Sequence, residues 1–392
     1  MKNTVITLFF ALWSIFTLGQ NLSDFLQYQQ TILPGNEIEF RYASSFLSAS
    51  EKQHLILVNR DVDREGKPFL VKGYFVDLKK STSAYFEIAL DRKQYRDAWS
   101  VRSIAFGGGY LLLNLSNQQV LFKQDGHNFE YVRKYAYTNI ETVFIEGETV
   151  LFTRLGKYTK SFGATENRVI TGSISSNDTT CRPVAIRGRA FSSIRPSNYY
   201  DYYKGNEVVL NPIDYALTVT TRGGEAQEYS PDYSDWMAVR DQDLRTIERA
   251  QDSGELTPFL LELTDEASRV WSVSFMGEDQ MFVVYTYPDI ENDKMLFYVD
   301  VWEKAKTGTW TLKHSKMARN QYRSMEKTTV LDKTNFPACF ENMGNKTIIT
   351  ADYICILTEE EAGSFEGKTY AAYFDAVKQH PTLKLHVFKR AF

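Results

Sequence analysis

The feature that most constrains the fold is a group of four short, mostly apolar segments joined by tight turns in residues 101–135. Each segment is long enough for a strand, and the turns between them are rich in Gly, Asn and Asp, as antiparallel hairpins require. The predicted strands are Val101–Phe106, Tyr110–Leu115, Val120–Lys123 and Phe129–Lys134. Four consecutive strands joined in this way predict one antiparallel meander.

The same order of strands and turns recurs along the chain. Five further groups show it, at residues 37–95, 140–186, 199–229, 270–314 and 325–392. A meander repeated in this way is typical of a β-propeller, because each blade buries its two faces against its neighbours around a central channel. We therefore predict an all-β, six-bladed β-propeller. The alternative is an all-β sandwich followed by an α+β domain.

Two segments interrupt the strand pattern. Apolar residues after Ser234 predict a short helical insertion near 234–250, and a second helix is predicted over 369–380, ended by Pro381. The predicted strands of the end blades are Glu37–Tyr42 at the start of the first, and Thr328–Leu331, Lys346–Leu357 and Leu383–Phe388 in the last.

The first twenty residues have the organisation of a secretory signal peptide. Lys2 supplies a positive charge, and a mostly apolar run extends from Val5 to Leu18. This run is shorter than the roughly 20 residues that span a bilayer. We predict a signal peptide at 1–19 and a single β-propeller domain at 20–392, with an uncleaved anchor as the alternative. The mature chain is expected to have no transmembrane segment and to be periplasmic or extracellular.

Composition argues against several partner classes. There are 45 Lys and Arg residues against 49 Asp and Glu, a net charge of -4, so no basic surplus favours nucleic acid. The 5 His residues form no pair at metal-ligand spacing, so neither a metal site nor a cofactor is predicted. Cys181, Cys339 and Cys355 are interpreted as two or three buried small hydrophobic residues, with a Cys339–Cys355 disulfide as the alternative.

One acidic loop has part of a calcium-binding pattern. Asp61, Asp63 and Glu65 occupy alternate positions and Gly66 follows them. The position that should supply a bidentate Glu is Lys72, so a polar hairpin turn is the preferred interpretation.

Residues 187–203 contain the candidate ligand-binding residues. Tyrosines flank Asp201, and three arginines lie just before them. Tyr and Arg at the mouth of a propeller channel suit stacking on a sugar ring or binding of an anion. The candidate ligand-binding residues are Arg189, Arg195, Tyr199 and Tyr202. The alternative, which the sequence favours, is that these tyrosines fill the space between blades.

Two short segments resemble a known group of proteins. His380–Lys389 is a Pro step into an alternating strand, and Tyr203–Pro212 is a hairpin. Through them the chain resembles uncharacterised six-bladed β-propeller proteins that Gram-negative bacteria export. The resemblance implies this fold over residues 37–392 and an exported location. It implies no activity and no catalytic residue, and the chain lacks the lipoprotein Cys common in that group.

Two function classes follow from these patterns. The first is a non-catalytic module that binds a glycan, peptide or protein at one face of the propeller. The alternative is a hydrolase, lyase or lactonase with its active site at the channel mouth. Histidines and carboxylates converging on several inner strands would favour the enzyme. The His residues are mostly scattered singly, so the sequence favours binding and no catalytic residue is selected.

Overall fold

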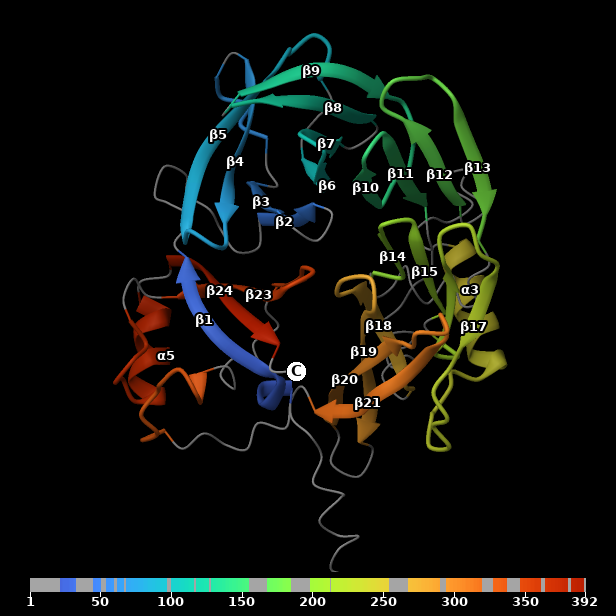
Figure 1. Cartoon of the computed structure of the whole chain (residues 1–392), viewed down its shortest axis with the longest axis vertical. Coiled ribbons are helices and arrows are strands. Elements are labelled where there is room, and N and C mark those ends of the chain that lie inside the picture. The colour runs from blue at the N-terminus through green and yellow to red at the C-terminus, as the bar shows by residue number, and fades with distance from the viewer. Residues whose placement is uncertain are drawn as a thin grey trace, which may run out of the picture.

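Six four-stranded antiparallel sheets are arranged in a ring (Figure 1). This computed structural model confirms the predicted all-β, six-bladed β-propeller. The structure describes residues 22–32, 45–50, 54–59, 62–66, 68–96, 100–115, 118–126, 128–154, 168–184, 198–211, 213–253, 267–289, 294–318, 327–336, 346–360, 364–379 and 382–390. The predicted signal peptide at 1–19, the predicted strand Glu37–Tyr42 and Cys339 lie outside these ranges.

The first five blades are meanders of consecutive strands, each beginning at the centre of the ring. Blade 1 comprises β2 (Ser45–Ser50), β3 (His54–Asn59), β4 (Phe69–Asp77) and β5 (Thr82–Leu90). Blade 2 comprises β6 (Val101–Gly107), β7 (Tyr110–Leu115), β8 (Gln118–Asp125) and β9 (Asn128–Tyr135). Blade 3 comprises β10 (Thr142–Glu146), β11 (Thr149–Arg154), β12 (Arg168–Ser173) and β13 (Thr179–Pro183). Blade 4 comprises β14 (Tyr200–Tyr203), β15 (Asn206–Asn211), β16 (Ala216–Thr220) and β17 (Ala226–Tyr229). Blade 5 comprises β18 (Arg269–Phe275), β19 (Gln280–Asp289), β20 (Lys294–Lys304) and β21 (Trp310–Ala318).

The sixth blade combines strands from opposite ends of the chain. From the centre outward it comprises β22 (Lys346–Ile349), β23 (Tyr353–Glu360), β24 (Thr382–Arg390) and β1 (Leu26–Ile32). β1 runs antiparallel to β24, with Leu26 opposite Arg390 and Ile32 opposite Leu385. The first strand thus closes the ring as the outer strand of the last blade.

Blade 6 differs from its predicted strands in two ways. The predicted strand Lys346–Leu357 is a hairpin, because the chain turns between β22 and β23. The predicted strand Thr328–Leu331 is wrong: Val330 makes an isolated bridge with Thr369 beside the sheet. As the first strand of the blade it would need the innermost position, which β22 takes.

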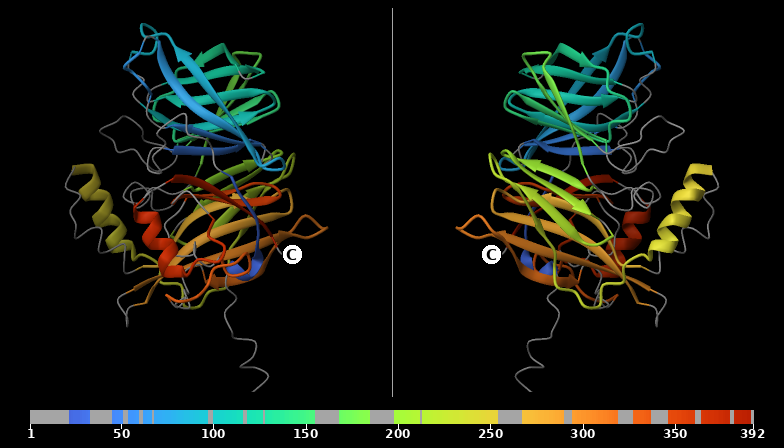
Figure 2. Two further views of the ribbon diagram at one scale, coloured as in Figure 1. Left: turned by 90° about the vertical axis from the view of Figure 1, so that its left-hand side faces the viewer. Right: turned by 90° about the vertical axis from the view of Figure 1, so that its right-hand side faces the viewer.

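The two faces of the ring differ in their connections. Within a meander, the first and third turns lie on one face, here called the turn face. The second turn and the link to the next blade lie on the other, here called the connection face. On the turn face the Glu146 carboxylate accepts the Gly205 N–H at 2.9 Å, and Lys204 pairs with Glu278, so inner turns contact from blade to blade. Helices α3 (Asp241–Ser253) and α5 (Tyr370–Gln379) both project from the connection face (Figure 2).

The helices agree with the prediction except for one boundary. The predicted helix near 234–250 begins only at Asp241, because hydrogen bonds hold the preceding residues against the blades. The Trp236 indole N–H donates to the Ile213 carbonyl at 2.7 Å, and the Met237 N–H donates to Ser268 Oγ at 3.1 Å. The helix predicted over 369–380 is confirmed as α5, and a short 3-10 helix, η1 (Leu22–Phe25), precedes β1.

The core lies in the layers between blades. In β7, Leu111 and Leu113 pack toward blade 1, whereas Leu112 packs toward blade 3. Inner strands are therefore apolar on both faces, unlike the strands of a half-exposed sheet. Packing within blade 1 is close enough to require Gly73 in β4, since a Cβ there would lie 2.6 Å from the carbonyl oxygen of Leu57 in β3.

The cysteines only partly follow the prediction. Cys355 in β23 is fully buried, and this burial raises the pKa of its thiol to about 12. Cys181 is exposed on β13, contrary to the expected burial of such residues. β13 is an outer strand whose side chains all face solvent, so it offers no core to enter.

The acidic loop between β3 and β4 is a hairpin turn. Asp63 pairs with Leu70 across the turn, and its carboxylate accepts Lys72 Nζ at 2.6 Å and the Glu65 N–H at 3.1 Å. The Asp63 carboxylate is therefore used within the turn.

Candidate functional site

The structure separates the predicted ligand-binding residues. Tyr199 is 3% exposed and packs in the core between blades 4 and 5. Tyr202 is half-buried and faces the neighbouring blade 3, with its ring centroid 6.5 Å from that of Phe144. Burial, together with nearby Glu146, raises the pKa of the Tyr202 hydroxyl. Arg189 and Arg195 lie outside the described residues.

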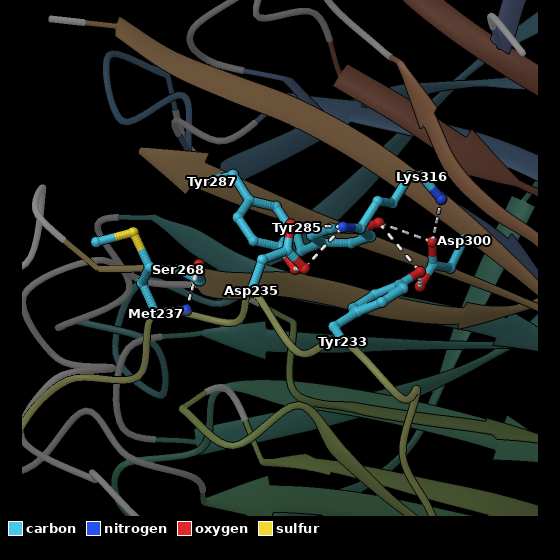
Figure 3. Close-up of polar contacts among 8 residues, drawn as sticks. All are labelled: Tyr233, Asp235, Met237, Ser268, Tyr285, Tyr287, Asp300 and Lys316. Carbon is cyan, nitrogen blue, oxygen red and sulfur yellow. Dashed lines mark hydrogen bonds and ion pairs between the residues drawn. The ribbon is translucent and has the colours of Figure 1, made fainter. Parts of the chain in front are cut away.

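A second group of polar and aromatic residues converges between blades 4 and 5, centred on Asp300 of β20 (Figure 3). Asp300 is fully buried and accepts hydrogen bonds from the hydroxyls of Tyr215 at 2.6 Å, Tyr233 at 2.7 Å and Tyr285 at 2.9 Å. The backbone N–H of Lys316 donates a fourth, at 2.8 Å. We call these five residues, together with Asp235 and Tyr287, the Asp300 site.

Strained backbone surrounds the buried carboxylate. Tyr215 and Lys316 have φ angles of 47° and 49°, a left-handed conformation that is uncommon outside Gly. The pairing of β20 with β21 shifts here, so that Asp300 lies opposite both Ser315 and Lys316. Such a bulge re-aims side chains, and strain of this kind persists only where surrounding contacts maintain it. The hydrogen bonds to Asp300 are those contacts.

Asp235 and Lys316 form the solvent-exposed part of the site. Lys316 Nζ lies 2.8 Å and 2.7 Å from the two carboxylate oxygens of Asp235. It also lies over two rings, 4.8 Å from the centroid of Tyr233 and 5.0 Å from that of Tyr287. The Tyr287 hydroxyl donates to Asp235 at 3.3 Å. The Asp235 side chain is 60% exposed and that of Lys316 is 37% exposed, so a ligand can reach both.

A short segment of chain fixes the position of Asp235. Trp236 packs its ring against Tyr215 and Tyr287, with centroids 5.5 Å and 5.4 Å apart. Reciprocal bonds join the next residue, Met237, to Ser268, because the Ser268 N–H also donates to the Met237 carbonyl at 2.7 Å. Asp235 is exposed, but it lies between Tyr233, whose hydroxyl donates to Asp300, and these two anchored residues.

The buried tyrosines of the site stay neutral, whereas Asp235 and Lys316 form a charged pair at the surface. Burial and the Asp300 charge raise the pKa values of Tyr215, Tyr233 and Tyr285, so these hydroxyls stay neutral donors. Burial also raises the pKa of Asp300, while its four hydrogen bonds favour the ionised form and offset part of the increase. At the surface, the hydrogen bond from Lys316 lowers the pKa of Asp235.

The predicted segment and the Asp300 site adjoin the same strand, β18. Asn198 forms a parallel bridge with Ser272, and its N–H donates to the Trp271 carbonyl at 3.1 Å. At the start of that strand, Ser268 holds the segment that contains Asp235. Asn198, three residues after Arg195 in the sequence, therefore lies beside the strand that supports the Asp300 site.

Sequence reasoning missed the Asp300 site, although one signal was present. Residues 295–302 of β20 are apolar or aromatic apart from Asp300, which alternates with the aromatic residues Tyr298 and Trp302. A carboxylate on the buried face of a strand needs partners, and Tyr285 of β19 supplies one of them. The other partners come from distant segments, so no local pattern connects them.

The described residues contain neither a metal-binding cluster nor a membrane-spanning helix. No three His, Cys, Asp or Glu side chains within the described ranges are placed to hold a metal ion. In the same part of the chain, no helix is long and apolar enough to cross a membrane.

Comparisons with known proteins find similarity of chain path alone. No protein-family model matches the sequence, and no curated protein matches it. The WD40 domain of Neurospora crassa Pan2 superposes with a TM-score of 0.42 at 7% identity, covering 95% of this chain and 98% of that chain. The N-terminal domain of Nup159 gives 0.40 at 12% identity, covering 93% and 95%. A catalytically inactive virginiamycin B lyase from Staphylococcus aureus, solved with quinupristin, gives 0.37 at 10% identity, covering 92% and 99%. These values are too low to transfer a ligand, an activity or a residue role.

Proposed function

We propose that this chain is an exported, non-catalytic binding module that takes a glycan, peptide or protein ligand on the connection face of blades 4 and 5. The observation that supports this most strongly is that the Asp300 site combines a buried carboxylate, Asp300, with an exposed ion pair, Asp235 and Lys316. The buried carboxylate already accepts four hydrogen bonds, so its oxygens position the tyrosines. The exposed groups are the Asp235–Lys316 ion pair, which lies against the half-buried ring of Tyr233 and the buried ring of Tyr287; an ion pair on aromatic rings is recognition chemistry.

Preorganisation explains why such a surface would bind well. The hydroxyls of Tyr233 and Tyr287 are held by Asp300 and Asp235, so their rings lose little further freedom when a ligand arrives. Rigid aromatic anchors of this kind give affinity because the ordering cost is met before binding.

Arg189, Arg195, Tyr199 and Tyr202 form the second part of the proposed binding region. Support comes from the contact of Asn198 with β18, which brings the end of their segment beside the strand that anchors the Asp300 site. Tyr199 is buried at the entry to β14 and Tyr202 is half-buried within that strand, so both would act mainly by shaping the strand that borders the region.

The exported location rests on the apolar run that ends near Gly19. A mature protein that begins at Gln20 is expected in the periplasm or the medium. Intact-mass measurement of the exported protein tests this, and a species that retains Met1 in the membrane fraction would contradict it.

The binding function is tested by screening the mature chain against glycan and peptide arrays and by protein capture, with two matched variants. Asp235→Asn changes the exposed carboxylate of the site. Glu278→Gln changes a carboxylate of similar exposure, 58% against 60%, that pairs with Lys204 on the turn face. We expect Asp235→Asn to weaken binding of a ligand found in the screen and Glu278→Gln to leave that binding unchanged. Equal effects of the two variants would refute this location, and chemical conversion of the ligand would favour the hydrolase, lyase or lactonase alternative.

A further inference from the structure

The ammonium group of Lys316 occupies a receptor built by other residues of the chain. Its Nζ lies against the faces of Tyr233 and Tyr287, at 4.8 Å and 5.0 Å from their centroids, and against both oxygens of Asp235. Two aromatic faces and a carboxylate are the groups that bind organic cations, because ring quadrupoles and a negative charge both attract them.

The receptor does not depend on Lys316 for its shape. The Tyr233 hydroxyl is held by Asp300, Tyr287 lies in the core between blades 4 and 5, and Trp236 packs behind the Tyr287 ring. The backbone of Lys316 is fixed separately, through its N–H bond to Asp300. Its side chain can therefore leave while both the rings and the bulge stay in place.

We infer that the ligand of the Asp300 site carries an organic ammonium group, and that Lys316 is an internal occupant which this group displaces. The inference rests on the proposed function, since it names the ligand class of the same site. The ligand ammonium would lie between Tyr233 and Tyr287 and pair with Asp235. Lys316, already 37% exposed, would turn its charge to solvent.

Competition with Lys316 sets the expected affinities. The tethered ammonium is always near the receptor, so a free cation must overcome a high effective concentration. Removing it with Lys316→Ala exposes the two ring faces and the carboxylate. We expect a free cation to bind this variant about 5- to 30-fold more tightly than the wild type, the factor that one cation–π and ion-pair contact supplies.

The test uses choline chloride as the probe and its uncharged isostere 3,3-dimethylbutan-1-ol as the matched compound. Binding is followed by isothermal titration and by ligand-observed NMR on the mature chain. The matched protein control is Lys313→Ala, which removes an exposed lysine from the same strand, 3.8 Å from Glu303. Melting curves check the fold of each variant, and Lys316→Gln replaces Lys316→Ala if the latter does not fold.

The inference is supported if choline binds Lys316→Ala more tightly than wild type and Lys313→Ala, if the isostere does not bind, and if adding Asp235→Asn abolishes the gain. It is overturned if choline does not bind Lys316→Ala, or if the isostere binds equally well. If choline fails while a ligand from the screen still depends on Asp235, the inference falls and the proposed function stands. If no ligand depends on Asp235, both fall.

Discussion

Removing β1 is expected to open the propeller. Leu26 is 7% exposed and packs in the core between blades 5 and 6, whereas Ile32 is 2% exposed and packs in the core between blades 6 and 1. Burying each side chain contributes about 1.5–3 kcal/mol. Tyr28 adds edge-to-face contacts with Phe336 and Phe388, with centroids 5.8 Å and 5.9 Å apart, worth about 0.5–1.5 kcal/mol each.

These contributions come to roughly 4–9 kcal/mol before the ordering of the strand is deducted, against a total stability of about 5–15 kcal/mol for most proteins. A chain that begins at residue 33 should therefore lose most of its cooperative melting by far-UV circular dichroism. A chain that begins at Leu22 is the control and should melt like the full protein. A synthetic peptide of residues 22–32, added in trans, should restore part of the transition because it supplies the missing edge strand.

Deleting Leu383–Phe392 should be at least as damaging, because β24 pairs with both β1 and β23. The reasoning is refuted if the chain that begins at residue 33 melts as the wild type does. It is also refuted if the peptide has no effect on a truncated chain that still shows a weakened transition.

Three further perturbations test other parts of the structure. Gly73→Ala should lower the free energy of unfolding in urea by about 1–3 kcal/mol, because the added Cβ would meet the Leu57 carbonyl oxygen. Gly66→Ala is the control and should be neutral, because the nearest atom to its Cβ would be 3.7 Å away. Equal stabilities of the two variants would contradict the close packing at Gly73. Tyr199→Ala should cost about 3–5 kcal/mol of stability as a buried aromatic. Tyr202 is half-buried, so Tyr202→Ala should cost less stability than Tyr199→Ala and should weaken ligand binding by about 1–3 kcal/mol. If neither variant changes ligand binding, both tyrosines serve in packing. Lys316 and the Tyr287 hydroxyl lower the pKa of Asp235 in the folded protein. Their contribution to the stability of the fold is therefore present above about pH 3.9, the pKa of Asp in the unfolded chain, and is lost as the pH falls through the lower pKa of folded Asp235. Acid titration should therefore destabilise wild type more than Asp235→Asn, and parallel curves would refute the pairing.

The regular blades were predictable because local signals agree with the final structure. In blade 2, apolar strands and glycine turns mark each hairpin, so predicted and observed strands nearly coincide. The closing strand was not predictable in this way. Leu26–Ile32 contains three Gln residues and a weak apolar pattern, and it becomes a strand through pairing with β24 at the far end of the chain.

The candidate site shows the same limit at the level of side chains. Aromatic density drew attention to Tyr199–Tyr203, where the tyrosines are close in sequence but point to different blades. The Asp300 site draws its donors from Tyr215, Tyr233, Tyr285 and Lys316, which only the stacking of blades 4 and 5 brings together. A charged residue in an apolar strand indicates that partners exist, but it does not say where they lie.

The division of the ring into a turn face and a connection face has a consequence for divergence and engineering. On the turn face, short turns such as those at Gly205 and Gly277 contact neighbouring blades, so lengthening one would disturb the next. The connection face already accommodates α3 and α5 between strands, and lengthening a surface loop there costs little entropy. New recognition loops or reporter peptides are therefore best inserted on the connection face, where specificity can change while the ring of sheets below keeps its register.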